Sequence, residues 1–130
     1  MSMTRLNPDT LHKNPAFTQV MVVENPSKHI FVGGQNGVNA KGELVGVDIA
    51  SQTEQALKNV LAALEAAGAT MASVVKLTIY VAQGYSLQEG FAAAQRVLGT
   101  NIPPPTISVI VVAGLANPQF LIEIEAMALL

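Results

Sequence analysis

The sequence lacks cysteine altogether and carries unusually little charge. Of its 130 residues, 12% are charged and 50% are hydrophobic, whereas a typical soluble domain carries about 25% charged residues. The absence of cysteine excludes disulfides, thiolate metal sites and cysteine nucleophiles. The charge is too sparse to cover an ordinary monomer surface. The chain therefore either lies in a membrane or buries a second surface in an oligomer.

Long apolar runs are also missing, and this decides between the two alternatives. A membrane-spanning helix needs about 20 consecutive apolar residues, and the apolar stretches 107–116 and 120–130 are far shorter. The N-terminal segment has no apolar core and does not resemble a signal peptide. We therefore predict a cytoplasmic protein that forms an oligomer and has no membrane partner.

A basic surface stripe is absent as well. The formal net charge is −2, and the seven Lys and Arg residues are spread along the chain. Aromatic residues, four Phe and two Tyr, are also few. Nucleic-acid binding requires a track of cations for the phosphates, often with aromatic side chains that stack on bases. We therefore predict no nucleic-acid partner.

What the sequence does contain is a series of strand patterns within one domain, residues 1–130. Runs rich in β-branched and aromatic residues predict five strands. These strands are 18–24, 29–35, 73–82, 106–115 and 120–129. Turn residues predict that the first two strands form a hairpin, that the last two form an adjacent pair, and that a tight turn lies at Lys41-Gly42.

Two amphipathic helices are predicted between the strands. Apolar residues at helical spacing predict a helix over 48–67, ended by a glycine. Its N-cap is either Ser51, in a capping box with Glu54, or Asp48. A second helix is predicted over 86–99, with a serine and a glutamate forming its capping box.

The predicted order is β-β-α-β-α-β-β, an α/β (α+β) domain with two helices packed on one face of a four- or five-stranded sheet. Strands 106–115 and 120–129 are nevertheless apolar on both faces. A sheet face without helices needs a partner, and the simplest partner is another copy of the chain. Glu123 and Glu125 share the side of Leu121, and we predict that this side faces the partner.

Four phrases resemble a known family. They are VGGQNGVN (32–39), QALKNVLAALEAAGA (55–69), SVVKLTIYV (73–81) and LIEIEAMA (121–128). In this order and spacing they resemble the RidA/YjgF family, also called L-PSP endoribonucleases. The resemblance implies a chorismate-mutase-like fold and a homotrimer with a cleft between each pair of subunits. It also implies hydrolysis of reactive enamines and imines, such as 2-aminoacrylate, to keto acids and ammonia.

The resemblance further implies which residues border the cleft. In the family, a C-terminal glutamate positions the attacking water and an arginine holds the substrate carboxylate. The glutamate falls on Glu123 and a glycine whose backbone borders the ligand falls on Gly34. A residue that offers its backbone N–H falls on Val109. The expected ligand is a small molecule, and no cofactor and no metal are expected.

Four positions depart from the family pattern. Ile107 stands at the arginine position, in the phrase PTIS where the family has PARS. Phe17 replaces an aromatic hydroxyl, Gly33 replaces a serine, and the helix asparagine falls near Gly90. Isoleucine cannot form the bidentate, charge-assisted pair that arginine forms with a carboxylate. We therefore expect a substrate that need not carry a carboxylate.

Three functions remain open at this point. They are a RidA-like hydrolase, a trimer that binds a small metabolite without turnover, and an endoribonuclease, which the charge disfavours. Glu123 is interpreted as a cleft residue, and Glu125 as a residue paired with a neighbouring strand or subunit. His12 and His29 are interpreted as surface residues. No group of His, Asp and Glu has metal-ligand spacing.

Overall fold

The computed structural model describes residues 1–130. In chain order, its elements are β1 (Ser2–Leu6), β2 (Val20–Glu24), β3 (His29–Gln35), α1 (Ile49–Ala66), the short 3₁₀ helix η1 (Met71–Ser73), β4 (Val74–Ala82), α2 (Leu87–Leu98), β5 (Thr106–Val112) and β6 (Ile122–Leu129). Neither α-helix combines the length and hydropathy that crossing a membrane requires.

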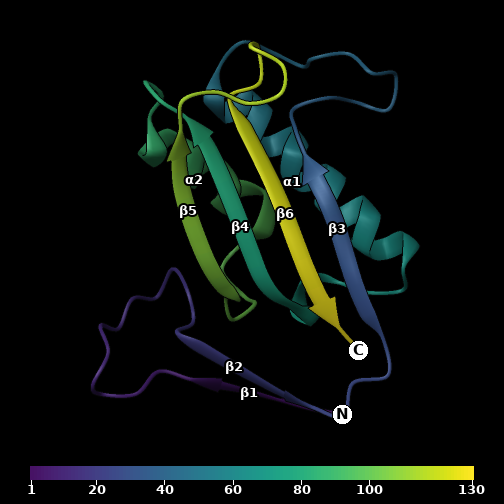
Figure 1. Cartoon of the computed structure of the whole chain (residues 1–130), viewed down its shortest axis with the longest axis vertical. Coiled ribbons are helices and arrows are strands. Elements are labelled where there is room, and N and C mark those ends of the chain that lie inside the picture. The colour runs from purple at the N-terminus through teal and green to yellow at the C-terminus, as the bar shows by residue number, and fades with distance from the viewer.

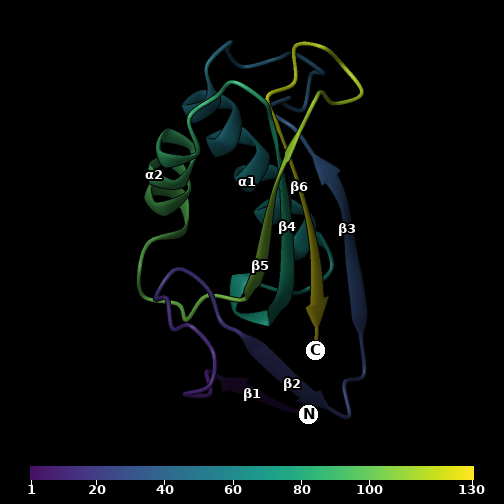
Figure 2. The ribbon, with the colours of Figure 1, turned by 60° about the vertical axis from the view of Figure 1, so that its left-hand side comes forward.

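The main sheet has four strands in the order β3-β6-β4-β5 (Figure 1). Strand β6 runs antiparallel to both of its neighbours, β3 and β4, while β4 and β5 are parallel. Both helices lie on the same face of this sheet, as the turned view in Figure 2 shows. The prediction of an α+β domain with two helices on one face is therefore confirmed.

The predicted strand pairs are wrong. Strand β2 does not pair with β3 but with β1, a strand that was not predicted, in a separate two-stranded sheet. The N–H groups of Ser27 and Lys28 instead donate to the carbonyl oxygen of Leu130, at 2.6 and 2.8 Å. The backbone N–H groups between β2 and β3 are thus hydrogen-bonded to the C-terminal residue. Strand β3 then pairs with β6. Strand β4 likewise lies between β5 and β6.

Both predicted helices are confirmed, with boundaries shifted by about one residue. Asp48 is the N-cap of α1, because its carboxylate accepts a hydrogen bond from Ser51 N at 2.9 Å. This hydrogen bond lowers the pKa of Asp48 below its usual value. Ser86 caps α2 in the same way and accepts from Glu89 N at 3.1 Å. Gly68 follows α1 with a φ of +79°, a conformation that favours glycine.

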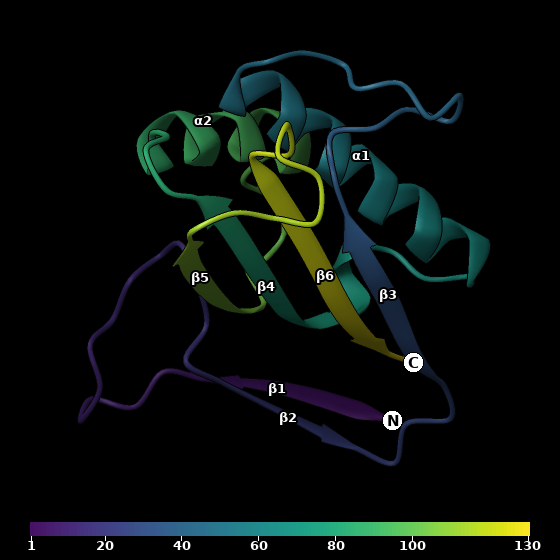
Figure 3. The same cartoon turned by 45° about the horizontal axis from the view of Figure 1, so that its top comes forward.

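The hydrophobic core lies between α1 and the sheet. The apolar stripe of α1 packs against the strands, and three of its residues, Leu57, Val60 and Leu64, are at most 1% exposed. Helix α2 packs beside α1 and makes few contacts with the strands, and Figure 3 shows the two helices side by side over one face. Ala93 is the only buried residue of α2. A space therefore remains between α2 and the sheet.

Candidate functional site

Glu123 lies near the start of β6, on the sheet face that has no helices. Its carboxylate is half-buried, and Asn36 Nδ2 donates to its Oε1 at 3.3 Å and to the carbonyl oxygen of Ile122 at 2.9 Å. A Cβ at Gly34 would lie only 2.6 Å from the carboxylate carbon, so the glycine makes room for the acid. No cation lies within salt-bridge distance of Glu123.

Helix α1, on the opposite face of the sheet, holds the segment that carries Asn36. Asn59 Nδ2 donates to the backbone carbonyl oxygens of Asn36 and Val38, at 3.1 and 2.8 Å. Gln55 in turn donates to Asn59 Oδ1 at 2.8 Å. The segment after β3 is thereby fixed to the helix, and the amide of Asn36 is positioned toward Glu123. Asn36 was not predicted as a site residue, because the phrase QNG is also typical of a turn.

Glu125 lies two residues further along β6 and has a different partner. The hydroxyl of Tyr80, on the adjacent strand β4, donates to Glu125 Oε1 at 3.1 Å. This hydrogen bond raises the pKa of Tyr80, and desolvation and the charges of Glu125 and Glu123 act in the same direction. Glu125 is thus paired with a neighbouring strand, one of the two arrangements predicted for it.

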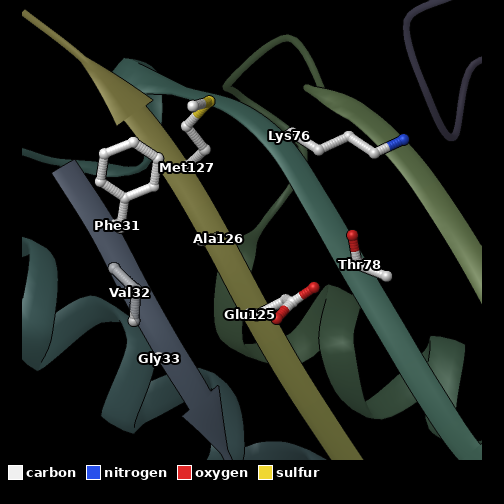
Figure 4. A pocket seen from close by; sticks show the side chains of 8 residues that line it. All are labelled: Phe31, Val32, Gly33, Lys76, Thr78, Glu125, Ala126 and Met127. Atoms are coloured by element: carbon white, nitrogen blue, oxygen red, sulfur yellow. The ribbon is translucent and has the colours of Figure 1, made fainter. Parts of the chain in front are cut away.

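A shallow hollow of 380 Å³ extends from Glu125 over the same open face (Figure 4). Its lining residues are Phe31, Val32, Gly33, Lys76, Thr78, Glu125, Ala126 and Met127. Gly33, one of the predicted site residues, borders this hollow. Lys76 extends toward β5, where its ammonium donates to Ser108 Oγ at 2.8 Å. It therefore neutralises neither glutamate.

The other predicted site residues lie on the opposite face. Phe17, Gly90, Ile107 and Val109 line a groove of 1090 Å³ between α2 and the sheet. Glu123 and Gly34 do not border this groove. A single copy of the chain thus separates the predicted site into two groups, with the acid on one face and the apolar positions on the other.

The segment before β2 closes one side of this groove. Thr18, which is 3% exposed, donates its backbone N–H to Pro105 O at 3.0 Å and its hydroxyl to Pro104 O at 2.6 Å. These two hydrogen bonds hold Phe17 beside the start of β5. Thr53 of α1, a buried threonine, also lines the groove.

The titratable groups offer no other site of this kind. His12 and His29 are both exposed, as predicted. No three His, Cys, Asp or Glu side chains come together in a group that could hold a metal ion.

Several known proteins are similar to this chain in sequence. The chain is 37% identical over 101 residues to a RutC family protein from Pasteurella multocida, covering 76% of this chain and 78% of that protein. A RutC family protein from Pyrococcus horikoshii is 45% identical over 53 residues, which is 40% of this chain and 42% of that protein. The 2-iminobutanoate/2-iminopropanoate deaminase of Escherichia coli is 44% identical over 52 residues, or 40% and 41% of the two chains.

Solved structures and a family model agree with these relatives. A crystal structure of a Rid family protein of unknown function from Yersinia pestis superposes with a TM-score of 0.88 at 36% identity, covering 100% of both chains. The family model described as Endoribonuclease L-PSP matches residues 10–130. The chain therefore belongs to the RidA/YjgF family, which is also named for L-PSP endoribonuclease.

Proposed function

We propose that the protein is a RidA-type hydrolase that converts a small enamine or imine to a carbonyl compound and ammonia. In this proposal Glu123 positions the attacking water, and the site is a cleft between subunits of a homotrimer. Relatives named as imine deaminases support the reaction class. The observation that carries the proposal is the carboxylate of Glu123, which is held in place by an amide and is not neutralised by a cation.

Such a carboxylate suits the chemistry of C=N hydrolysis. A general base must hold a water molecule within hydrogen-bond reach of the carbon under attack. An enamine first tautomerises to the imine. Glu123 then accepts a proton from water as the oxygen bonds to carbon, and this proton passes to the imine nitrogen. The resulting carbinolamine expels ammonia as its C–N bond breaks, and its hydroxyl becomes the carbonyl group. Overall, one C=N group and one water give one C=O group and one ammonia.

The separation of the predicted residues on two faces supports an intersubunit site. Glu123 lies on the helix-free face, where Phe31, Ile110 and Met127 are also found. Phe31 is 72% exposed and Ile110 is 42% exposed in the single chain. Covering such a face with another copy would bury this apolar area. It would also bring residues of a second subunit to Glu123.

The decisive experiment compares two variants of the acids. Glu123→Gln keeps the shape and removes the base, so we expect ammonia release from enamines generated in situ to disappear while the melting temperature is kept or raised. Glu125→Gln alters a residue bonded to Tyr80, so we expect a smaller loss of activity and a lower melting temperature. If Glu123→Gln melts many degrees lower and activity per folded protein is unchanged, Glu123 is structural and the proposal is wrong.

The choice of substrate matters because of Ile107. Loss of a charge-assisted bidentate contact weakens transition-state binding by about 2–4 kcal/mol, or roughly 30- to 1000-fold. We therefore expect much weaker deamination of 2-aminoacrylate than an arginine-containing relative shows. Ile107→Arg should raise this activity. Activity of the unchanged protein within a few-fold of that relative would show that another group holds the carboxylate.

A binding trimer without turnover is the alternative function. It is favoured by the groove, which offers apolar contacts at the positions that hold the substrate carboxylate in the family pattern. Tight binding of a small molecule that is unaffected by Glu123→Gln, with no ammonia released from any enamine, would support this alternative.

A further inference from the structure

We propose that Asn36 is a modification site, at which the side-chain amide deamidates spontaneously to a carboxylate, and that this change disables Glu123. The amide of Asn36 donates to Glu123 Oε1 at 3.3 Å, so its loss is felt directly at the candidate site. The modification itself is independent of the proposed function. Only its effect on turnover rests on that function.

The sequence around Asn36 is the reactive one. Asn36 is the only asparagine of the chain that is followed by glycine. Deamidation begins when the backbone nitrogen of the next residue attacks the side-chain amide, and a glycine has no side chain to hinder that attack. Four other asparagines precede proline, which has no backbone N–H. The remaining three precede alanine, valine or isoleucine.

The fold itself demands the glycine after Asn36. Gly37 is buried, and a Cβ at this position would lie 2.7 Å from both Cα and Cβ of Gln52. Gln52 is 0% exposed, and its side-chain amide makes three hydrogen bonds to backbone groups of two loops. It therefore cannot move aside. The chain needs the amide of Asn36 beside Glu123 and a glycine next to it, and together these form the labile pair.

The attacking nitrogen is not occupied. The N–H of Gly37 donates no hydrogen bond, although the carbonyl oxygen of the same residue accepts from Val45 N at 3.0 Å. When this N–H loses its proton to solvent, the nitrogen bonds to Cγ of Asn36 and the side-chain nitrogen leaves as ammonia. Water then opens the cyclic succinimide at either carbonyl, which gives aspartate or isoaspartate. Overall, one amide and one water give one carboxylate and one ammonia.

Helix α1 restrains this reaction through Asn59. Its Nδ2 donates to the carbonyl oxygens of Asn36 and Val38, on both sides of Gly37, at 3.1 and 2.8 Å. The attack requires the peptide group between Asn36 and Gly37 to turn toward the side chain, and these hydrogen bonds oppose that rotation. The contacts that direct Asn36 toward Glu123 therefore also set how fast the pair reacts.

The product changes the surroundings of Glu123. An ionised aspartate has only acceptor oxygens, so Glu123 and the carbonyl oxygen of Ile122 both lose the donor that Asn36 supplies. Two carboxylates then face each other, and no cation lies within salt-bridge distance of Glu123. Like charges at such a separation repel. Deamidation thus displaces the group that is proposed to position water.

Peptide mapping by mass spectrometry tests the modification. Trypsin releases residues 29–41 as one peptide, which contains both Asn36 and Asn39. After the folded protein has been kept at physiological temperature, we expect aspartate and isoaspartate to accumulate at position 36, while Asn39 stays an amide. A synthetic peptide of the same residues gives the unrestrained rate. If position 36 is unmodified in the folded protein when the peptide has fully converted, the proposal is wrong.

A second comparison tests the restraint. Asn59→Ala removes both hydrogen bonds to the segment, so deamidation at Asn36 should become about five- to thirtyfold faster. Val60→Ala is the control, because Val60 lies on the same helix and is 0% exposed in the core. It lowers stability without removing a hydrogen bond to the segment. Equal acceleration in both variants would show that only unfolded molecules react, and would overturn the role of Asn59.

The effect on Glu123 is tested by the variant that imitates the product. We expect Asn36→Asp to melt a few degrees lower and to lose ammonia release from enamines. Asn39→Asp makes the same charge change in the same loop and should alter neither property. It keeps the oxygen that accepts from Lys41 N and Glu43 N, both at 3.0 Å. Full turnover by Asn36→Asp would overturn the proposed effect on Glu123.

A double variant separates this inference from the proposed reaction. Adding Glu123→Gln to Asn36→Asp should restore the melting temperature, because the new amide can donate to the new carboxylate. No recovery would show that the two side chains do not interact, and the effect on Glu123 would be refuted. A fresh protein that releases ammonia from no enamine, but accumulates aspartate at position 36 and shows this recovery, would refute the reaction and support the inference.

Discussion

The two faces of the main sheet differ in the burial and polarity of the side chains that the same strands place on them. In β6, Ile122 and Ile124 point toward α1 and are 2% and 1% exposed, whereas Glu123 and Glu125 point to the helix-free face and are half-buried. The helix-covered face is closed by apolar packing beneath α1. The open face instead carries hydrogen-bonded polar groups among exposed apolar ones. The difference teaches that period-two alternation separates residues that build the domain from residues available to a partner or ligand.

The largest effect should come from a charge on the open face. Ile110 is 42% exposed and lies on this face beside Tyr80. If the face is buried between subunits, Ile110→Asp places an unpaired charge there, which costs several kcal/mol. We expect the variant to dissociate or precipitate in size-exclusion chromatography with light scattering. Val47→Asp, at an exposed loop position, is the control and should keep the original mass. A monomeric mass for the unchanged protein at micromolar concentration would contradict the proposed homotrimer.

A truncation beneath α1 should weaken the fold itself. Leu57 is 1% exposed in the core, so Leu57→Ala should lower the free energy of unfolding by about 2–5 kcal/mol. Phe31→Ala, on the open face, should instead lower the melting temperature in a way that depends on protein concentration, because it weakens assembly. Thermal unfolding at several concentrations distinguishes the two. A concentration-independent loss for Phe31→Ala would show that this ring stabilises the single chain.

A smaller loss of stability is expected from adding a side chain at Gly34, where β3 lies against Glu123. A methyl group at Gly34 would lie 2.6 Å from the carboxylate, whereas one at Gly33 would meet nothing within 4 Å. Gly34→Ala should displace Glu123 from Asn36 and lower the free energy of unfolding by about 1 kcal/mol. Gly33→Ala should not. Adding Glu123→Ala to Gly34→Ala should remove the penalty in a double-mutant cycle, and additive effects would contradict the crowding.

The smallest effect concerns a proton on the open face. Tyr80 donates to Glu125, and its pKa is raised above the ordinary value of 10.0. Because the folded state holds this proton more tightly, the stabilisation is complete below the unfolded pKa and is lost as pH rises through the folded pKa. Absorbance titration of a Tyr85→Phe variant should report Tyr80 alone. Glu125→Ala should move its pKa back toward 10.0, and no movement would assign the shift to another cause.

The sequence predicted the positions of the helices and strands better than it predicted which strands pair in the sheet. Hydrophobic periodicity and capping residues located both helices, because these signals are local. Strand β3 pairs with β6, and Ser27 and Lys28 hydrogen-bond to Leu130 beside this pair, so the arrangement joins segments that are far apart in sequence. No local pattern distinguishes that arrangement from a hairpin. Strand β1 was missed because MSMTRL is short and weakly patterned, and it forms only one pair, with β2.

The sequence predicted individual site residues but did not predict that they lie on different faces of a single chain. The resemblance identified Glu123 and the position of Ile107, and the structure puts them on different faces of one chain. Asn36 was missed because its role depends on distant groups that accept its hydrogen bonds, Glu123 and the carbonyl oxygen of Ile122. That is a property of tertiary contacts and not of sequence spacing.

The position of β6 has a consequence for how the chain folds. Strand β6 is the last element in sequence, yet it lies between β3 and β4 in the sheet. During synthesis, the edges of β3 and β4 that pair with β6 therefore stay unpaired until residues 122–129 have been made. Contacts between segments so distant in sequence form slowly, and unpaired strand edges favour aggregation in the meantime. Helix α1 and β3, which contact each other in the folded structure, are both synthesised before the C-terminal strand that completes the sheet.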